Sequence, residues 1–320
     1  MGERWLLVLD GSTGVCSTAL LRATTTDNDE STLDTSLGTD EPWTVVADRN
    51  EADGRAQARV LLRLIDEMLS EVGQDSSSLD AVVVGTGPGT FTGVRITVAT
   101  ARALSLSLSV PVLGVSTLAA LAAGGAMGFA GRNVAEKFPQ MLIPVIDARR
   151  QQVFYGVYRR SEAGGAAAGV ASQQRWVRTG PFEVCDRGEF AERAALEADG
   201  SQKDKAAGAA IEVVGESEAL APGLQDGMVF RQTPVRAEWL VRGQDRLAEP
   251  GTLPEGDRIL PWLERTRCMG RSEIRLLQPH RVPGSPGTPE SIKPVYVRSP
   301  DADLHITKMR DPWASAKTER

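Results

Sequence analysis

The stretch Gly85 to Ser105, GTGPGTFTGVRITVATARALS, directly follows the apolar run AVVVG and decides how the first half of the chain folds. The apolar run predicts a strand, the glycine- and proline-rich residues predict a tight turn, and the remainder has the period of a helix. Many phosphate-binding loops also consist of a strand, a glycine-rich turn and a helix. The stretch therefore raises the question of whether this loop holds a phosphate.

The spacing within the loop excludes the two common phosphate-binding motifs. Thr90 stands where the dinucleotide motif G-x-G-x-x-G needs its third glycine, and no Lys-Ser/Thr pair follows at the spacing of a Walker A loop. Gly87 and Gly89, with Pro88 between them, are sufficient for a tight turn. The pattern alone leaves this turn and a ligand-binding role as equal alternatives.

The helix expected after the turn has two apolar sides. Phe91, Val94 and Val98 lie on one side, and a narrow polar stripe includes Arg95 and Arg102. The preceding helix, expected over residues 55–73, has an apolar stripe about twice as wide as one buried face requires. We expect each helix to contact its own sheet on one side and a neighbouring helix, a second domain or a separate protein on the other.

The elements around this stretch predict the fold class. A hairpin over residues 5–23, a strand over 43–48 and alternating helices and strands up to residue 124 give the order βββαβαβα, which is the ribonuclease H-like pattern. Residues 141–160 then repeat the strand, aspartate, turn and strand of the first hairpin, which indicates an internal duplication. The sequence therefore predicts an α/β protein with two ribonuclease H-like domains of the actin-like ATPase superfamily, each a mixed sheet flanked by helices.

The predicted domain boundaries follow changes in composition. The N-terminal domain is expected over residues 1–132 with a polar loop insertion at 24–42, and the C-terminal domain over 138–320. A segment rich in proline and glycine at 250–290 is expected to be a partly irregular insertion.

Composition and charge exclude several classes of protein. The 320 residues carry a net charge of −6 and only 5% aromatic residues, which argues against a basic nucleic-acid-binding face. The three cysteines form no C-x-x-C pair, and the two histidines, His280 and His305, are not spaced as metal ligands. We expect no metal site and no Ser-His or Cys-His catalysis. With no apolar run of membrane-spanning length, the sequence predicts a soluble cytoplasmic protein.

Two aspartates are the best candidates for nucleotide chemistry. Asp10 and Asp147 each end the first strand of a predicted domain, and in actin-like proteins the turn after this aspartate touches nucleotide phosphates. The alternative is that each carboxylate only caps its own turn. The expected weak nucleotide site comprises Asp10, Ser12, Thr13, Gly87, Gly89 and Asp147.

These aspartates also define the alternative function, a small-molecule phosphotransferase of the sugar-kinase type that uses Asp10 and Asp147. Such an enzyme needs a glycine pair for adenosine in its second domain. The candidate region VVGESEAL offers Gly215 alone, which counts against this function.

The segments GTGPGTFTGVRI and VPVLGVSTLAALA closely resemble the signature of the TsaB (YeaZ-like) family, and LVLDGSTGVCSTALL, IPVIDARRQQVFYGVY and KPVYVR match it in order. The resemblance covers most of residues 4–160 and 292–298 and implies a noncatalytic paralogue of TsaD. Such a subunit is required for threonylcarbamoylation of the adenosine next to the anticodon of ANN-decoding tRNAs. It also implies a heterodimer with TsaD, action with the ATPase TsaE through that complex, indirect contact with tRNA, and a homodimer when alone.

The sequence lacks the metal-binding histidines of TsaD-like proteins. When the Gly-Val-Asn-His-x-x-x-His motif of TsaD-like proteins is aligned on Gly114-Val115, Thr117 and Leu121 replace the metal-binding histidines. The resemblance implies no cofactor beyond weak binding of ATP or ADP with Mg²⁺. It places the partner interface on the helices of the N-terminal domain. We expect these side chains there: Leu61, Leu64, Met68, Phe91, Val94, Arg95, Val98 and Arg102.

Overall fold

A computed structural model of the chain describes residues 2–25, 43–52, 57–128, 139–161, 175–199, 211–244, 247–248 and 287–297. Most of the insertions expected at 24–42 and 250–290, both histidines and the expected boundary between residues 132 and 138 lie outside the described residues. That boundary stays a prediction.

The first sheet has five strands in the order β3-β2-β1-β4-β5. Their bounds are β1 (Gly2–Asp10), β2 (Cys16–Thr25), β3 (Thr44–Glu51), β4 (Ala81–Gly85) and β5 (Val112–Val115). β1, β2 and β3 pair antiparallel, whereas β4 runs parallel to both β1 and β5. Apolar residues on both faces of β1 and β4 are buried, as expected for strands that are covered on two sides.

The second sheet repeats this arrangement with two interrupted strands. Its strands are β6 (Met141–Arg149), β7 (Gln152–Tyr155), β8 (Tyr158–Ser161), β9 (Arg175–Arg178), β10 (Glu183–Asp186), β11 (Ile211–Gly215), β12 (Met228–Gln232) and β13 (Leu247–Ala248). β6 pairs antiparallel with β7 and then with β8, and parallel with β11, which pairs parallel with β12. β10 and β9 in turn pair with β7 and β8. The two sheets therefore share one strand order, which confirms the predicted fold class.

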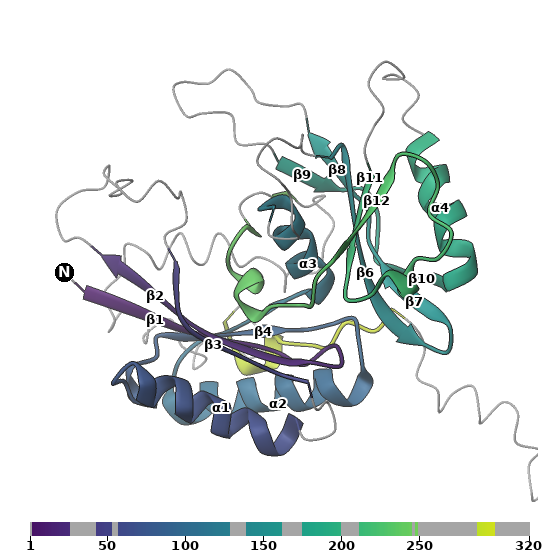
Figure 1. The fold of residues 1–320 in the computed structure, drawn as a ribbon. Coiled ribbons are helices and arrows are strands. Elements are labelled where there is room, and N and C mark those ends of the chain that lie inside the picture. Colours follow the sequence, from purple (N-terminus) through teal and green to yellow (C-terminus); the bar gives the residue numbers. More distant parts are fainter. Residues whose placement is uncertain are drawn as a thin grey trace, which may run out of the picture.

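The helices form an outer layer on each sheet and a layer between the sheets. Their bounds are α1 (Gln57–Glu71), α2 (Phe91–Leu108), α3 (Thr117–Ala126) and α4 (Arg187–Asp199), with short 3-10 helices η2 (Ser76–Ser78), η3 (Glu218–Leu220), η4 (Ala237–Leu240) and η7 (Pro289–Ser291). Figure 1 shows α1 and α2 on one side of the first sheet, α4 on the far side of the second sheet, and α3 between the sheets.

The helix α3 is buried along its whole length because it lies between the two sheets. All ten of its residues are buried, and the core around it contains side chains from β1, β6 and η4. The buried hydroxyl of Ser17 on β2 accepts a hydrogen bond of 2.8 Å from the backbone N–H of Ala237 on η4. One continuous apolar core therefore joins the two halves of the chain.

Close packing of α3 against η4 predicts a large effect for one glycine. A Cβ atom at Gly124 would lie 2.6 Å from the ring of Trp239, which is 2% exposed and cannot move into solvent. We expect Gly124→Ala to lower the free energy of unfolding by about 1–3 kcal/mol, measured by urea denaturation. Gly188→Ala is the control, because Gly188 lies in the first turn of α4 with no atom near its Cβ position. Equal losses for the two variants would contradict the packing assigned to Gly124.

Candidate functional site

The carboxylate of Asp10 lies at the junction of the two halves and is fully buried, with 0% of the residue exposed. It accepts hydrogen bonds from the backbone N–H of Ser12 at 2.9 Å, the Ser12 hydroxyl at 3.3 Å and the Thr117 hydroxyl at 2.8 Å. On the neighbouring strand β4, a Cβ atom at Gly85 would lie 1.8 Å from an Asp10 carboxylate oxygen. Glycine at position 85 therefore makes room for this carboxylate.

Burial raises the pKa of Asp10 from 3.8 to about 6. The hydrogen bonds from Ser12 and Thr117 act in the opposite direction, and the charge of Glu216 raises the pKa further. At neutral pH the carboxylate is therefore ionised, and burial of its charge away from water destabilises the folded chain.

The turn after Asp10 packs directly against the glycine-rich loop. The backbone N–H of Thr90 donates to the carbonyl oxygen of Ser12 at 2.6 Å. A Cβ atom at Gly89 would lie 2.1 Å from the same carbonyl oxygen. The two loops expected to hold phosphates thus contact each other, and Gly89 is needed for that close approach.

Three further backbone groups of the glycine-rich loop also bind within the chain. The N–H of Thr86 donates to the carbonyl of Val115 at 2.8 Å, and the carbonyl of Gly87 accepts from the N–H of Thr117 at 2.8 Å. The carbonyl of Thr86 accepts from the N–H of Val295 at 2.8 Å. These contacts favour the tight-turn alternative for the loop. Phosphate binding by Gly87 and Gly89 stays a prediction.

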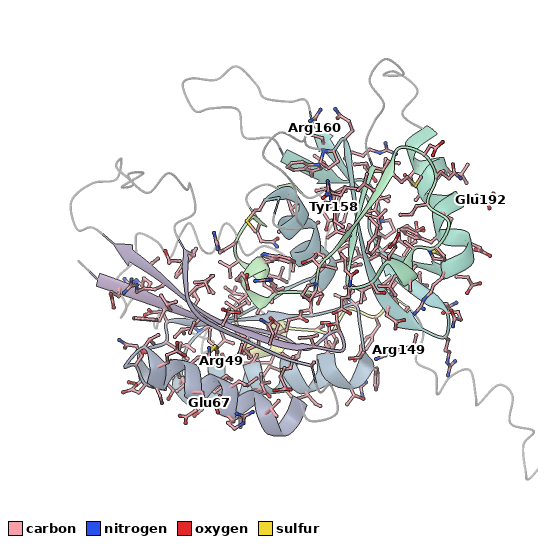
Figure 2. All side chains as sticks on the ribbon, in the orientation of Figure 1. Arg49, Glu67, Arg149, Tyr158, Arg160 and Glu192 are labelled. Atoms are coloured by element: carbon pink, nitrogen blue, oxygen red, sulfur yellow. The ribbon has the colours of Figure 1, made fainter. Side chains whose placement is uncertain are left out.

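Asp147 lies in β6, two residues before the strand ends at the turn to β7, and is partly exposed. Its carboxylate accepts hydrogen bonds of 2.7 Å from the backbone N–H of Arg149 and of 2.7 Å from the guanidinium of Arg187. Three consecutive residues of the turn, Arg149 to Gln151, have left-handed φ angles of 64°, 51° and 59°. Figure 2 labels Arg149 at this turn. The carboxylate therefore caps its own turn, as the alternative interpretation expects.

One acidic residue of the junction was missed by the sequence reasoning. Glu216 follows β11, accepts a hydrogen bond from the Thr13 hydroxyl, and interacts electrostatically with Asp10, Asp147 and Arg149. Burial, followed by the charge of Asp147, raises the pKa of Glu216. Polar residues at the carboxyl ends of parallel strands commonly lie at binding sites. Glu216 directly follows the apolar strand segment IEVVG in the sequence, and this signal could have identified it. Among the described residues, no group of three or more candidate ligands could hold a metal ion.

The eight residues expected at the partner interface differ in burial. Five of the eight are buried in the core or between α1, α2 and the first sheet: Leu61, Leu64, Met68, Val94 and Val98. The apolar stripes of the two helices are wide because the helices pack on the sheet and on each other. These five side chains are therefore not available to a partner in this conformation.

The exposed face of α1 and α2 has a different set of residues. Phe91 is 45% exposed, Arg95 is exposed, and Arg102 is half-buried with its guanidinium bound to the carbonyl of Ile292. The sequence reasoning missed Leu62 and Leu106, which are 57% and 61% exposed. Neither residue breaks the helical pattern, so no signal in the sequence separates them from the core. We call these residues, together with the exposed Ala99 and Ala103 between them on α2, the outer helix face.

Comparison with known proteins agrees with this architecture. The family model "TsaD: tRNA N6-adenosine threonylcarbamoyltransferase" matches residues 51–180. The tRNA threonylcarbamoyladenosine biosynthesis protein TsaB of Escherichia coli is 29% identical over 34% of this chain and 44% of its own length. TsaB of Haemophilus influenzae is 32% identical over 47% of this chain and 52% of its own length. The matches thus span about half the length of these curated relatives.

A solved structure extends the similarity to most of the chain. It is described as an uncharacterized protein with similarity to peptidase YEAZ from Pseudomonas aeruginosa, and it is 26% identical with a TM-score of 0.51. The match covers 92% of this chain and all of that one. Both sheets have the same strand order, and this arrangement defines the class of the protein. It is an actin-like protein built from two ribonuclease H-like halves. Within that class the chain is similar to the TsaB and YeaZ proteins named above. Among the helices that the structure describes, none combines the length and apolar character needed to cross a membrane.

Proposed function

We propose that this chain is the noncatalytic partner of a TsaD-type transferase in the synthesis of threonylcarbamoyladenosine next to the anticodon of ANN-decoding tRNAs. The similarity to two TsaB biosynthesis proteins supports the pathway. The exposed outer helix face supports the partner role, and it is the observation on which the proposal depends. The exposed Leu62 on α1 and Leu106 on α2 offer apolar surface, and the small Ala99 and Ala103 on α2 allow another helix to approach closely.

The residues at the catalytic positions of TsaD-like proteins also support a noncatalytic role. The Thr117 hydroxyl is bound to Asp10 and Ser12, at 2.8 and 2.7 Å. Leu121 is buried in the core between the sheets. Neither side chain supplies the imidazole that a catalytic metal would need there. We accordingly propose that TsaD carries the chemistry and that this chain contacts TsaE and tRNA only through the heterodimer, with a homodimer forming in the absence of TsaD.

The phosphotransferase alternative receives no support from the geometry. It requires Asp10 and Asp147 to meet a substrate, whereas Asp10 is fully buried and Asp147 is bound to Arg187. Weak binding of ATP or ADP with Mg²⁺ stays a prediction, for which titration calorimetry is the direct measurement.

The proposed role is tested by reconstitution. Purified TsaD, TsaE, threonylcarbamoyl-adenylate and tRNA are combined with and without this chain, and modified adenosine is measured by mass spectrometry. We expect modification only when the chain is present. Equal modification in its absence would refute the role.

A charge on the outer helix face should remove binding to TsaD. Ala99 is exposed on α2, so glutamate is tolerated by the free chain, but at an interface its larger side chain would block the close approach of the partner and its carboxylate would occupy Arg95, one helical turn away. We expect Ala99→Glu to weaken the complex at least 100-fold in calorimetry with an unchanged melting temperature. The matched control is Leu196→Glu, which changes an exposed leucine of α4 on the other half of the chain. Unchanged binding by Ala99→Glu would remove α2 from the interface.

A further inference from the structure

Residues 287–297, which we call the C-terminal strap, were expected in the C-terminal domain but pack on the first sheet and α2. The carbonyl of Gly287 accepts a hydrogen bond of 3.1 Å from the N–H of Val112 on β5. Near the other end, the N–H of Val295 donates to the carbonyl of Thr86 at 2.8 Å. The strap, drawn in yellow in Figure 1, is therefore attached to the N-terminal half at both ends.

The middle of the strap is anchored by burial. Ile292 is buried in the same core as Val98 of α2, and its carbonyl accepts from the guanidinium of Arg102. Ile292 also lies beside Gly114 on β5, where a Cβ atom would make an ordinary contact of 3.5 Å with the Ile292 side chain but would lie only 2.7 Å from the Thr86 side chain. These contacts hold the strap in one position along α2.

The last part of the strap completes a cluster with α2. The Tyr296 hydroxyl lies 3.1 Å from Nε of Arg95, and the Arg95 guanidinium lies 3.6 Å from the centre of the Phe91 ring. The two rings are 5.8 Å apart, and Phe91 and Tyr296 are 45% and 49% exposed. We call these three residues the Phe91–Arg95–Tyr296 cluster.

The guanidinium of this cluster is oriented but not saturated. Arg95 Nε is bound to Tyr296, whereas within the described part of the chain its two Nη groups have no hydrogen-bond or ion-pair partner. A guanidinium whose plane is fixed by stacking presents its remaining N–H groups as a fork that matches a carboxylate. Arginine and tyrosine are also enriched among the residues that carry most of the binding energy at protein interfaces.

We propose that the Phe91–Arg95–Tyr296 cluster anchors the partner by binding one of its carboxylates, so that the docking surface is composed of α2 and the C-terminal strap together. This inference rests on the proposed function. The partner that it specifies is a protein whose docking helix carries an aspartate or glutamate beside apolar side chains. The carboxylate pairs with Arg95, and the apolar groups pack on Phe91 and Ala99. Tyr296 is a positioning residue, because it acts by holding the guanidinium of Arg95.

The assignment is tested by calorimetric titration of full-length variants with purified TsaD. We expect Arg95→Ala to weaken binding 10- to 100-fold, and Arg95→Lys not to restore it, because lysine lacks the planar fork. Tyr296→Phe, which removes only the hydroxyl, is expected to weaken binding 3- to 10-fold. The double variant should be no weaker than Arg95→Ala, since both changes remove the same contact. Arg193→Ala on α4, in the other half of the chain, is the control, and melting temperatures check that every variant folds.

The outcomes separate this inference from the function on which it rests. If the unchanged chain does not bind TsaD, the proposed function fails and the anchor fails with it. If the unchanged chain binds and the Arg95 and Tyr296 variants bind equally well, the anchor is wrong while the proposed function stands. Independent, additive losses at Arg95 and Tyr296 would overturn the positioning role of Tyr296.

Discussion

Gly89→Ala is expected to destabilise the chain by more than about 3 kcal/mol, because its new methyl group would lie 2.1 Å from the carbonyl oxygen of Ser12. That oxygen belongs to the backbone, so no rotamer change relieves the clash. The hydrogen bond from the N–H of Thr90 to the same oxygen would be lost as the loops separate. Urea denaturation followed by circular dichroism measures the free energy of unfolding.

The control for Gly89 is another glycine of the same pair of loops. Gly14 is exposed and has no atom within 4 Å of its Cβ position, so Gly14→Ala should change stability by less than about 0.5 kcal/mol. A Gly89→Ala chain as stable as Gly14→Ala would show that the Asp10 turn and the glycine-rich loop are not in contact.

Asp10→Asn is expected to stabilise the chain at pH 7.5 by up to about 3 kcal/mol. The folded pKa of Asp10, about 6, lies above its ordinary value of 3.8, and each unit corresponds to 1.36 kcal/mol. A raised folded pKa means that the folded chain binds the proton more tightly than the unfolded chain. The resulting stability is present below about pH 4 and is lost as the pH rises through 6. Asparagine avoids the buried charge and keeps an acceptor for the N–H of Ser12.

The stability difference between Asp10→Asn and the unchanged chain should therefore grow from pH 4 to pH 7.5, measured by thermal unfolding. Asp75→Asn is a control for which we expect a stability change of opposite sign, because a hydrogen bond from the Ser77 hydroxyl lowers the pKa of Asp75. Its carboxylate stabilises the fold above its ordinary pKa, so removal of the charge should be unfavourable at pH 7.5. A pH-independent effect of Asp10→Asn would contradict the raised pKa.

The strand order could be predicted because it depends on local signals. Each half begins with an apolar strand that has an aspartate at or near its end, Asp10 in β1 and Asp147 in β6, followed by a turn and a second strand. The helices after β3 and β4 also have apolar periodicity that is visible in the sequence. These patterns specify which residues are apolar and how they repeat.

The interface residues could not be predicted from the same patterns. Val98 and Leu61 face the sheet, whereas Leu106 and Leu62 face solvent, and all four are apolar residues on helices. A wide apolar stripe is produced equally by a buried second face and by a docking surface, so periodicity does not distinguish them. The helix α1 occupies part of the second face of α2, and this became visible only in the structure.

Polar contacts between residues far apart in the chain also could not be predicted from the sequence. Thr117 was noted only because it replaces a histidine, and its hydroxyl binds Asp10 across 107 positions of the chain. Tyr296 binds Arg95 across 201 positions. Such pairs leave no periodic signal, because the contact depends on how separate elements are brought together.

The C-terminal strap has a consequence for the order in which the chain is synthesised. Ribosomes add about 5–20 residues per second, so Tyr296 is made roughly 10–40 seconds after Arg95, the residue that it positions. During this interval the nascent N-terminal half lacks the Tyr296 contact of the proposed anchor. Under the proposed anchor, partial chains that end before the strap would bind the proposed partner more weakly, so the partner would be recruited mainly by chains whose translation has passed residue 296.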